Sequence, residues 1–143
     1  MLYRLARSMS SAASSRKPGV ASPSQLSAFL SAAGPHICIV DARAPEAAAE
    51  PSSSLGALAP SSSRPRAISA PLDRATGELP LAAIPPAWIA AAGGKDKLCV
   101  ITHCGGGGRG QKAKDFLLKS GFSQVLNGGG PEDAECWAVF GSR

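Results

Sequence analysis

The sequence predicts an α/β fold with a central, mainly parallel sheet flanked by helices. Two short apolar runs rich in β-branched residues, 36–40 and 97–102, are typical of strands buried on both faces of a sheet. Segments with apolar residues at helical spacing lie before the first run and after the second. Strands that alternate with helices in this way argue for a parallel sheet.

The first helix is expected to begin at Ser22. An N-cap, a proline at the first helical position and a capping-box glutamine are supplied by Ser22, Pro23 and Gln25. The residues expected to face the core are Leu26, Phe29 and Leu30. Gly34 and Pro35 end this helix, and the strand 36–40 follows, with Cys38 inside it as an inert core residue.

The middle of the chain carries weaker signals. Residues 44–65 are dominated by Ala, Pro and Ser and predict a long loop or a partly mobile insertion. A second strand is expected at 67–70, and a helix at 86–92 in which Trp88 and Ile89 face the core.

The strongest strand, 97–102, leads through His103 and Cys104 into four consecutive glycines. An amphipathic helix must follow, because one face collects Ala113, Phe116, Leu117 and Ser120. Gly121 ends it, a last strand is expected at 124–126, and a final helical turn opens at Pro131 with Glu132 and Asp133 favourable to its dipole.

The formal charge of +5 is concentrated near the N-terminus. Four of the 15 basic residues precede the first acidic residue, Asp41, so the chain from Asp41 onward carries 11 basic and 10 acidic residues. A balanced domain with one Tyr, four Phe and two Trp offers no basic stripe interleaved with aromatic rings, and we expect no nucleic-acid partner. No apolar stretch approaches the roughly 18 residues needed to cross a bilayer, and we expect no membrane role.

Residues 1–21 are expected to be a disordered organellar transit peptide. The opening 17 residues are rich in Arg and Ser and free of acidic residues, and at helical spacing the apolar side chains fall opposite the arginines. A secretory signal would need a continuous apolar core of about seven or more residues, which is absent. The expected destination is the mitochondrion, with the plastid as the alternative because of the many serines, and a merely disordered basic tail is the other interpretation.

The remaining residues, 22–143, are expected to form a single domain, because the chain is too short for two of typical size. The cysteines show neither zinc-ligand nor thioredoxin spacing, and they lie at Cys38, Cys99, Cys104 and Cys136. We therefore expect no metal, no disulfide framework and a reducing compartment.

Cys104 is the candidate nucleophile. It stands at the carboxyl end of a buried strand and before a helix N-terminus, where ligands collect in α/β folds. Glycines without Cβ atoms allow the backbone to curl with several N–H groups pointing inward as an anion-binding nest. These donors and the helix dipole favour the thiolate, and the guanidinium of Arg109 suits an oxyanion. The side chain of His103 should alternate away from Cys104, so we assign it to the structure rather than to catalysis.

These residues resemble the rhodanese family over about residues 24–139. The matching segments, in order, are Ile39-Val40-Asp41-Ala42-Arg43, Arg66 to Leu72, Val100-Ile101-Thr102-His103-Cys104 with Gly107 and Arg109, Gly121-Phe122, Val125, Gly129-Gly130 and Trp137. The resemblance implies a rhodanese-like domain of the single-domain type. A family run of Gly-His-Ile-Pro-Gly-Ala before the second strand is absent here, and the loop is all glycine where many relatives place a polar side chain that helps to choose the donor.

The resemblance implies a thiosulfate sulfurtransferase that carries sulfane sulfur as a persulfide on Cys104. The substrate loop would be formed by Gly105, Gly106, Gly107, Gly108, Arg109 and Gly110, and Asp41 and Arg43 would brace the fold beside it. No cofactor is implied. The expected partners are a small donor such as thiosulfate and an acceptor such as glutathione, thioredoxin or cyanide, and we expect a monomer.

Two alternatives remain open. A cysteine phosphatase or arsenate reductase also carries His-Cys followed by Gly and Arg, but it places five residues between Cys and Arg, whereas Cys104 and Arg109 enclose four. A non-enzymatic sulfur-carrier or sensor module is the second alternative, because a fold does not fix an activity.

Overall fold

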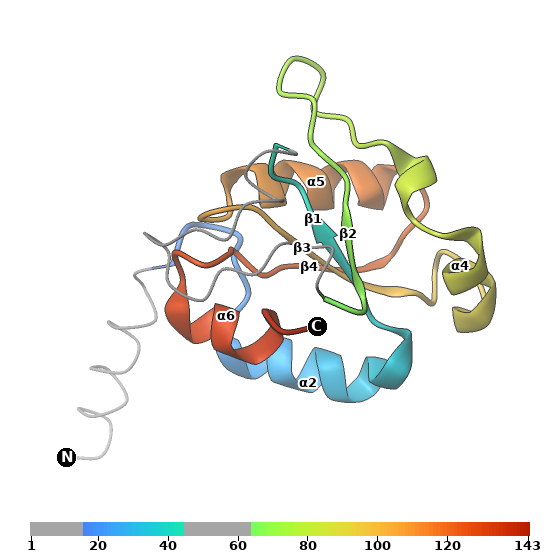
Figure 1. The fold of residues 1–143 in the computed structure, drawn as a ribbon, viewed down its shortest axis with the longest axis horizontal. Helices are drawn as coiled ribbons and strands as arrows, with labels where there is room; N and C mark the ends of the chain where they lie inside the picture. Colours follow the sequence, from blue (N-terminus) through green and yellow to red (C-terminus); the bar gives the residue numbers. More distant parts are fainter. Residues whose placement is uncertain (1–15, 45–63) are drawn as a thin grey trace.

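The chain folds around a four-stranded, all-parallel sheet with helices on both faces, which confirms the predicted α/β class (Figure 1). The structure, a computed structural model, describes residues 16–44 and 64–143. Most of the predicted transit peptide and the predicted loop at 44–65 lie outside the described residues. No helix in the described part is long and apolar enough to cross a membrane.

The strands run in the order β2-β1-β3-β4, with every neighbouring pair parallel. Their bounds are β1 Cys38–Asp41, β2 Ala67–Ser69, β3 Cys99–His103 and β4 Gln124–Asn127. The observed register places Asp41 beside His103 and Thr102 beside Asn127. The carboxyl ends of β1, β3 and β4 therefore meet at one edge of the sheet.

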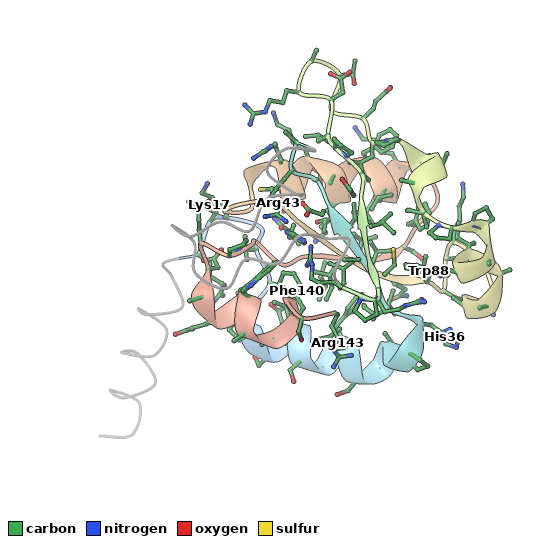
Figure 2. All side chains as sticks on the ribbon, viewed as in Figure 1. Lys17, His36, Arg43, Trp88, Phe140 and Arg143 are labelled. Atoms are coloured by element: carbon green, nitrogen blue, oxygen red, sulfur yellow. The ribbon has the colours of Figure 1, made fainter. Side chains whose placement is uncertain are left out.

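Each face of the sheet has its own core. On one face, Ile39 and Ile101 pack with α2 (Pro23–Ala33) and α6 (Ala134–Phe140), where Phe140 is fully buried (Figure 2). On the other face, Val40 and Val100 pack with α4 (Pro86–Ala92) and α5 (Gly108–Lys119). The alternation follows from the two-residue repeat of a strand, and it explains why consecutive residues at the centres of β1 and β3 are apolar.

The helix that begins the predicted domain has the caps that the sequence predicts. The Ser22 hydroxyl accepts the Gln25 backbone N–H at 3.1 Å, and the Gln25 side chain accepts the Ser22 N–H at 2.8 Å. This reciprocal pair satisfies two of the free N–H groups of the first turn. Leu26 and Leu30 are buried, and Phe29 packs at the margin of the same core.

Several boundaries differ from the prediction. Residues Gly34–His36 form a short 3-10 turn (η1), so β1 begins two residues later than predicted. A second 3-10 turn, η3 at Leu81–Ala83, lies in a segment for which no element was predicted. The C-terminal helix does not open at Pro131: residues 131 and 132 form a turn, the Asp133 N–H donates to the Gly130 carbonyl at 2.9 Å, and α6 follows. That turn brings Glu132 to the edge of the sheet where the strands end.

The folded part also begins before Ser22. Val20 and Ala21 are buried, and the Ala21 N–H donates to the Asn127 carbonyl at 2.8 Å beside a parallel bridge between Val20 and Asn127. The packed part of the described structure therefore includes two residues that precede the predicted start of the domain. The capping box marks the start of the first helix, but the two apolar residues before it extend the sheet at the β4 edge.

Candidate functional site

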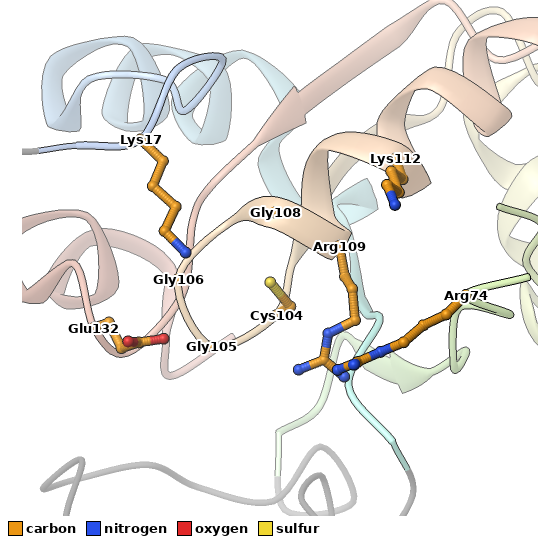
Figure 3. A pocket seen from close by; sticks show the side chains of 9 residues that line it. All are labelled: Lys17, Arg74, Cys104, Gly105, Gly106, Gly108, Arg109, Lys112 and Glu132. Atoms are coloured by element: carbon orange, nitrogen blue, oxygen red, sulfur yellow. The ribbon is translucent and has the colours of Figure 1, made fainter.

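Cys104 lies between the end of β3 and the start of α5, at the carboxyl edge of the sheet (Figure 3). Its thiol accepts a hydrogen bond from the backbone N–H of Gly107, with 3.1 Å between nitrogen and Sγ. The residue is only 3% exposed, yet it lines an open pocket of about 400 Å³. The sulfur is thus both held by the backbone and reachable from solution.

The helix after Cys104 turns backbone donors toward this pocket. The first hydrogen bond of α5 runs from the Gln111 N–H to the Gly107 carbonyl, at 2.9 Å. The preceding N–H groups in the first turn therefore have no intrahelical acceptor and face the N-terminal end of the helix. With the partial positive charge of the dipole, they favour an anion at Cys104.

Gly107 needs the freedom of glycine. Its φ is +113°, and a Cβ there would lie 2.8 Å from Val20 Cγ2. Its carbonyl accepts a hydrogen bond from Asn127 Nδ2 at 3.0 Å, while Asn127 Oδ1 accepts the Gly129 N–H at 3.0 Å. The buried amide of Asn127 therefore ties the Cys104 loop to the end of β4.

The predicted substrate loop divides into two parts. The pocket wall includes Gly105, Gly106, Gly108 and Arg109. Gly107 contributes its N–H to the sulfur but is absent from that wall, and Gly110 faces inward. A Cβ at Gly110 would lie 3.2 Å from His103 Cα and 2.6 Å from Asn127 Oδ1, so Gly110 permits α5 to approach the sheet. The structure gives Gly110 a packing role, and substrate binding by Gly110 stays a prediction.

The segment after β4 runs along the same loop. The Cys104 N–H donates to the Gly129 carbonyl at 3.0 Å, and the Glu132 N–H donates to the Gly105 carbonyl at 3.0 Å. Gly130 has a φ of +150°, and a Cβ there would overlap the carbonyl oxygen of Cys104. This close backbone approach holds the loop that begins at Cys104 in place, and it positions Glu132 in the pocket wall.

Sequence reasoning missed most of the charged side chains of the pocket. In addition to Arg109, the pocket is lined by Lys17, Arg74, Lys112 and Glu132. These residues come from the segment before α2, the loop between β2 and α4, helix α5 and the turn before α6. No local sequence pattern links these residues, and Lys17 lies in the predicted transit peptide.

Beneath the loop lies a buried charged cluster formed by Asp41, Arg43, Arg64 and His103. Arg43 donates to both carboxylate oxygens of Asp41, at 2.8 Å from Nε and 2.5 Å from Nη2, and Arg64 Nη2 lies 3.4 Å from Oδ2. Burial acts to raise the pKa of Asp41, but the Arg43 hydrogen bonds and neighbouring charges outweigh it and lower that pKa. Asp41 and Arg43 thus form the buried bidentate pair expected of residues that brace the loop.

His103 belongs to this cluster and not to the pocket. Its ring is fully buried, with Nε2 3.1 Å from Arg64 Nη2 and Nδ1 3.2 Å from the Cys104 carbonyl. Because the guanidinium can only donate, Nε2 accepts and Nδ1–H donates to Cys104. Burial lowers the pKa of His103 to about 4, so the ring is neutral at physiological pH. This geometry agrees with the structural role predicted for His103.

The buried histidine should make the protein sensitive to acid. In the unfolded chain the His103 ring is protonated near pH 6.5, but in the folded chain only near pH 4. The contribution of the neutral ring to stability is therefore complete above pH 6.5 and is lost as the pH falls to 4. The free energy of unfolding should drop by about 3 kcal/mol over that interval from this group.

Denaturant unfolding at a series of pH values measures this dependence. His103→Gln should flatten the slope between pH 6.5 and 4 even where it lowers overall stability. His36→Gln, which removes the exposed second histidine, is the matched control variant. Equal slopes for native protein and His103→Gln would contradict the assignment.

The other cysteines are poor candidates for the nucleophile. Burial raises the pKa of Cys38 to about 12 and that of Cys136 to about 11, and it also raises the pKa of Cys99. Cys38 is fully buried in the core, as predicted. These three thiols therefore stay protonated at neutral pH.

Comparison with known proteins finds no family model, no curated protein and no solved structure that matches the chain. Within residues 16–44 and 64–143, no group of three or more His, Cys, Asp or Glu side chains is placed to hold a metal ion.

Proposed function

We propose that this chain is a rhodanese-like sulfurtransferase that moves sulfane sulfur from a donor such as thiosulfate to a thiol or cyanide acceptor. The observation that carries the proposal is the 3.1 Å hydrogen bond from the Gly107 N–H to the sulfur of Cys104, at a helix N-terminus in a pocket rich in cations. A sulfur held in this way has the surroundings that a persulfide anion requires.

The first half-reaction loads the enzyme. The Cys104 thiolate attacks the outer sulfur of thiosulfate, a bond forms between the two sulfurs, and the bond to the sulfite group breaks with its electron pair on sulfite. The backbone donors of the loop stabilise the persulfide anion, and Arg109 helps to bind the donor and the leaving sulfite. The second half-reaction passes the outer sulfur to an acceptor, which restores the thiolate.

The surroundings of Cys104 support this chemistry in two further ways. Among the described residues of the buried cluster, two arginines face one carboxylate, so a positive charge remains beneath the loop. His103 is neutral and donates to the Cys104 backbone, and it is not directed at the sulfur. The cycle therefore uses one nucleophile and fixed donors, with no separate base required on the enzyme.

Loop size favours sulfur transfer over phosphatase or arsenate reductase chemistry. Cys104 and Arg109 enclose four glycines, and the Gly107 N–H converges on a single sulfur atom. A phosphatase loop of five residues wraps a tetrahedral oxyanion instead.

Mass spectrometry of the purified protein after treatment with thiosulfate tests the proposal. We expect one added sulfur atom per chain, located on Cys104, and its loss when an acceptor thiol is added. Absence of the added sulfur, or its location on another cysteine, would refute the assignment. If Cys104 gains a sulfur atom but no acceptor removes it catalytically, the result would favour the alternative function of a non-enzymatic sulfur-carrier module.

A further inference from the structure

The segment before α2, residues 17–21, forms a short strap, which we call the N-terminal strap. It opens with a tight turn, in which the Val20 N–H donates to the Lys17 carbonyl at 3.2 Å. The central residues of this turn are Pro18 and Gly19, and Gly19 has a φ of +87°. Proline followed by a glycine with positive φ is typical of a type II turn. The turn places Lys17 in the pocket wall (Figure 3) and directs the chain toward the end of β4.

Backbone contacts anchor the N-terminal strap beside β4. The Ala21 N–H donates to the Asn127 carbonyl at 2.8 Å, and Val20 forms a parallel bridge with Asn127. Cys136 Sγ donates to the Ala21 carbonyl at 3.4 Å. Burial raises the pKa of Cys136 to about 11, so the thiol keeps the proton that this hydrogen bond requires. The strap therefore has a defined position relative to the sheet.

The side chain of Val20 fills the space between two glycine backbones. A Cβ at Gly107 would lie 2.8 Å from Val20 Cγ2, and a Cβ at Gly129 would lie 3.2 Å from Val20 Cγ1. Because neither glycine has a Cβ, both methyl groups of Val20 reach the backbone directly. Val20 is buried and is not among the described residues that line the pocket. It therefore contacts the loop without contributing to the pocket wall.

The backbone that Val20 contacts carries the donor to the sulfur, because the Gly107 N–H bonds to Cys104 Sγ at 3.1 Å. A run of four glycines has no side chains to fix its conformation, and glycine loses more backbone entropy on ordering than any other residue. The position of this N–H consequently depends on neighbouring groups. Asn127 holds the carbonyl of Gly107, and Val20 occupies the space beside its Cα. A β-branched side chain suits this task, because its χ1 angle is restricted.

We infer, on the basis of the proposed sulfurtransferase function, that Val20 is a positioning residue for the loading of Cys104. Its side chain keeps Gly107 in place, so that the Gly107 N–H stays directed at the sulfur when the persulfide anion forms. The N-terminal strap is thus part of the functional site, although it lies within the predicted transit peptide. If that peptide is removed, the cut has to leave Val20 in the mature chain for full activity.

Val20→Ala tests this role in the full-length protein. The change removes both methyl groups that contact the glycines, so the Gly107 N–H remains present but is free to move, and a misaligned hydrogen bond is weaker. Complete loss of one such donor typically costs about 10²–10³ in rate, and we expect a partial loss, about tenfold in the maximal rate of loading from thiosulfate. The thiosulfate concentration for half-maximal loading should stay unchanged, because Val20 does not line the pocket. Mass spectrometry of single-turnover samples follows the added sulfur.

Two variants separate positioning from general destabilisation. Val20→Thr keeps an atom at both γ positions and should load at close to the native rate. Val125→Ala removes the same two methyl groups from a valine of similar burial, 6% exposed against 8% for Val20, in the core on the other face of the sheet. It should lower the midpoint of thermal unfolding and leave the maximal loading rate unchanged.

Gly19→Val displaces the N-terminal strap without a change in the core. Gly19 is exposed, and a β-branched residue rarely adopts its positive φ. The turn should open and shift Val20, with the same loss of loading rate as in Val20→Ala. Gly34→Val is the matched control, because it replaces another glycine of positive φ, +59°, between α2 and the start of β1. It should load at the native rate.

The amide of Gly107 gives a readout that does not depend on turnover. Its hydrogen bond to Cys104 Sγ should slow the exchange of this amide with solvent, as followed by two-dimensional NMR. Val20→Ala should shift the Gly107 resonance and speed its exchange by about tenfold, because one net hydrogen bond is worth about that factor. Val125→Ala should leave both unchanged.

The outcomes distinguish the positioning role from the proposed function. Failure of the native protein to load Cys104 would refute sulfur transfer, and the Gly107 amide would still test the contact with Val20. Normal loading of the native protein, together with a native maximal rate and an unchanged Gly107 amide in Val20→Ala, would overturn the positioning role and leave sulfur transfer intact. An equal loss of rate in Val125→Ala would overturn it as well. If Val20→Ala does not fold, Gly19→Val decides by the same criteria.

Discussion

Replacing Cys104 with serine is expected to abolish sulfur transfer while leaving the fold intact. A hydroxyl oxygen cannot carry a stable sulfane sulfur, so the persulfide intermediate is lost. Removal of a catalytic nucleophile costs on the order of 10⁴–10⁶-fold in rate, and turnover should fall to the uncatalysed level. The serine oxygen can still accept the Gly107 N–H that now bonds to Sγ, so the loop keeps its hydrogen bond.

Thiosulfate consumption measures the expected loss of sulfur transfer, and thermal unfolding measures whether the fold stays intact. The midpoint of unfolding of Cys104→Ser should stay within a few degrees of the native value. Cys99→Ser, at a half-buried cysteine at the start of β3, serves as the control and should keep full activity. Turnover by Cys104→Ser at the native rate would eliminate the persulfide mechanism.

The elements of the fold were predictable where their signals are local. The capping box at Ser22 specifies the start of α2. The β-branched runs specify β1 and β3, because a strand buried on both faces reads as a nearly continuous apolar run. The predictions are wrong where contacts with residues distant in the sequence decide the local structure. Val20 packs against Gly107 and pairs with Asn127. The residues around Val20 in the sequence do not indicate either of these distant partners.

The candidate site was predictable only as far as it is continuous in the chain. Cys104 and Arg109 are five positions apart, so strand, loop and helix could be read together. Arg74 and Glu132 reach the same pocket from other segments, and the order of strands that brings them there cannot be derived from their neighbours. Asn127 did carry a signal, because a polar residue that ends a buried strand before three glycines needs a hydrogen-bonding partner.

Inserting one glycine between Gly107 and Gly108 is expected to cause the second largest loss of activity. The insertion gives five residues between Cys104 and Arg109, which is the phosphatase spacing. It falls between the residue that donates to Sγ and the first residue of α5. Asn127 holds the Gly107 carbonyl, and Thr102 Oγ1 donates to the Gly110 carbonyl at 2.7 Å, so the loop is fixed at both ends and the extra residue must bulge into the pocket.

The backbone donors should then sit farther from the sulfur and stabilise the persulfide less well. Loss of one such donor typically costs about 10²–10³ in rate, and we expect the thiosulfate rate to fall by about that factor. A glycine inserted between Gly93 and Gly94, at the end of α4 and the opposite edge of the sheet, should leave the rate nearly unchanged. The widened loop should in turn admit phosphate or arsenate more readily. If the native protein hydrolyses an aryl phosphate faster than it consumes thiosulfate, and the insertion leaves the thiosulfate rate unchanged, the loop-size argument is wrong and phosphatase chemistry should replace sulfur transfer.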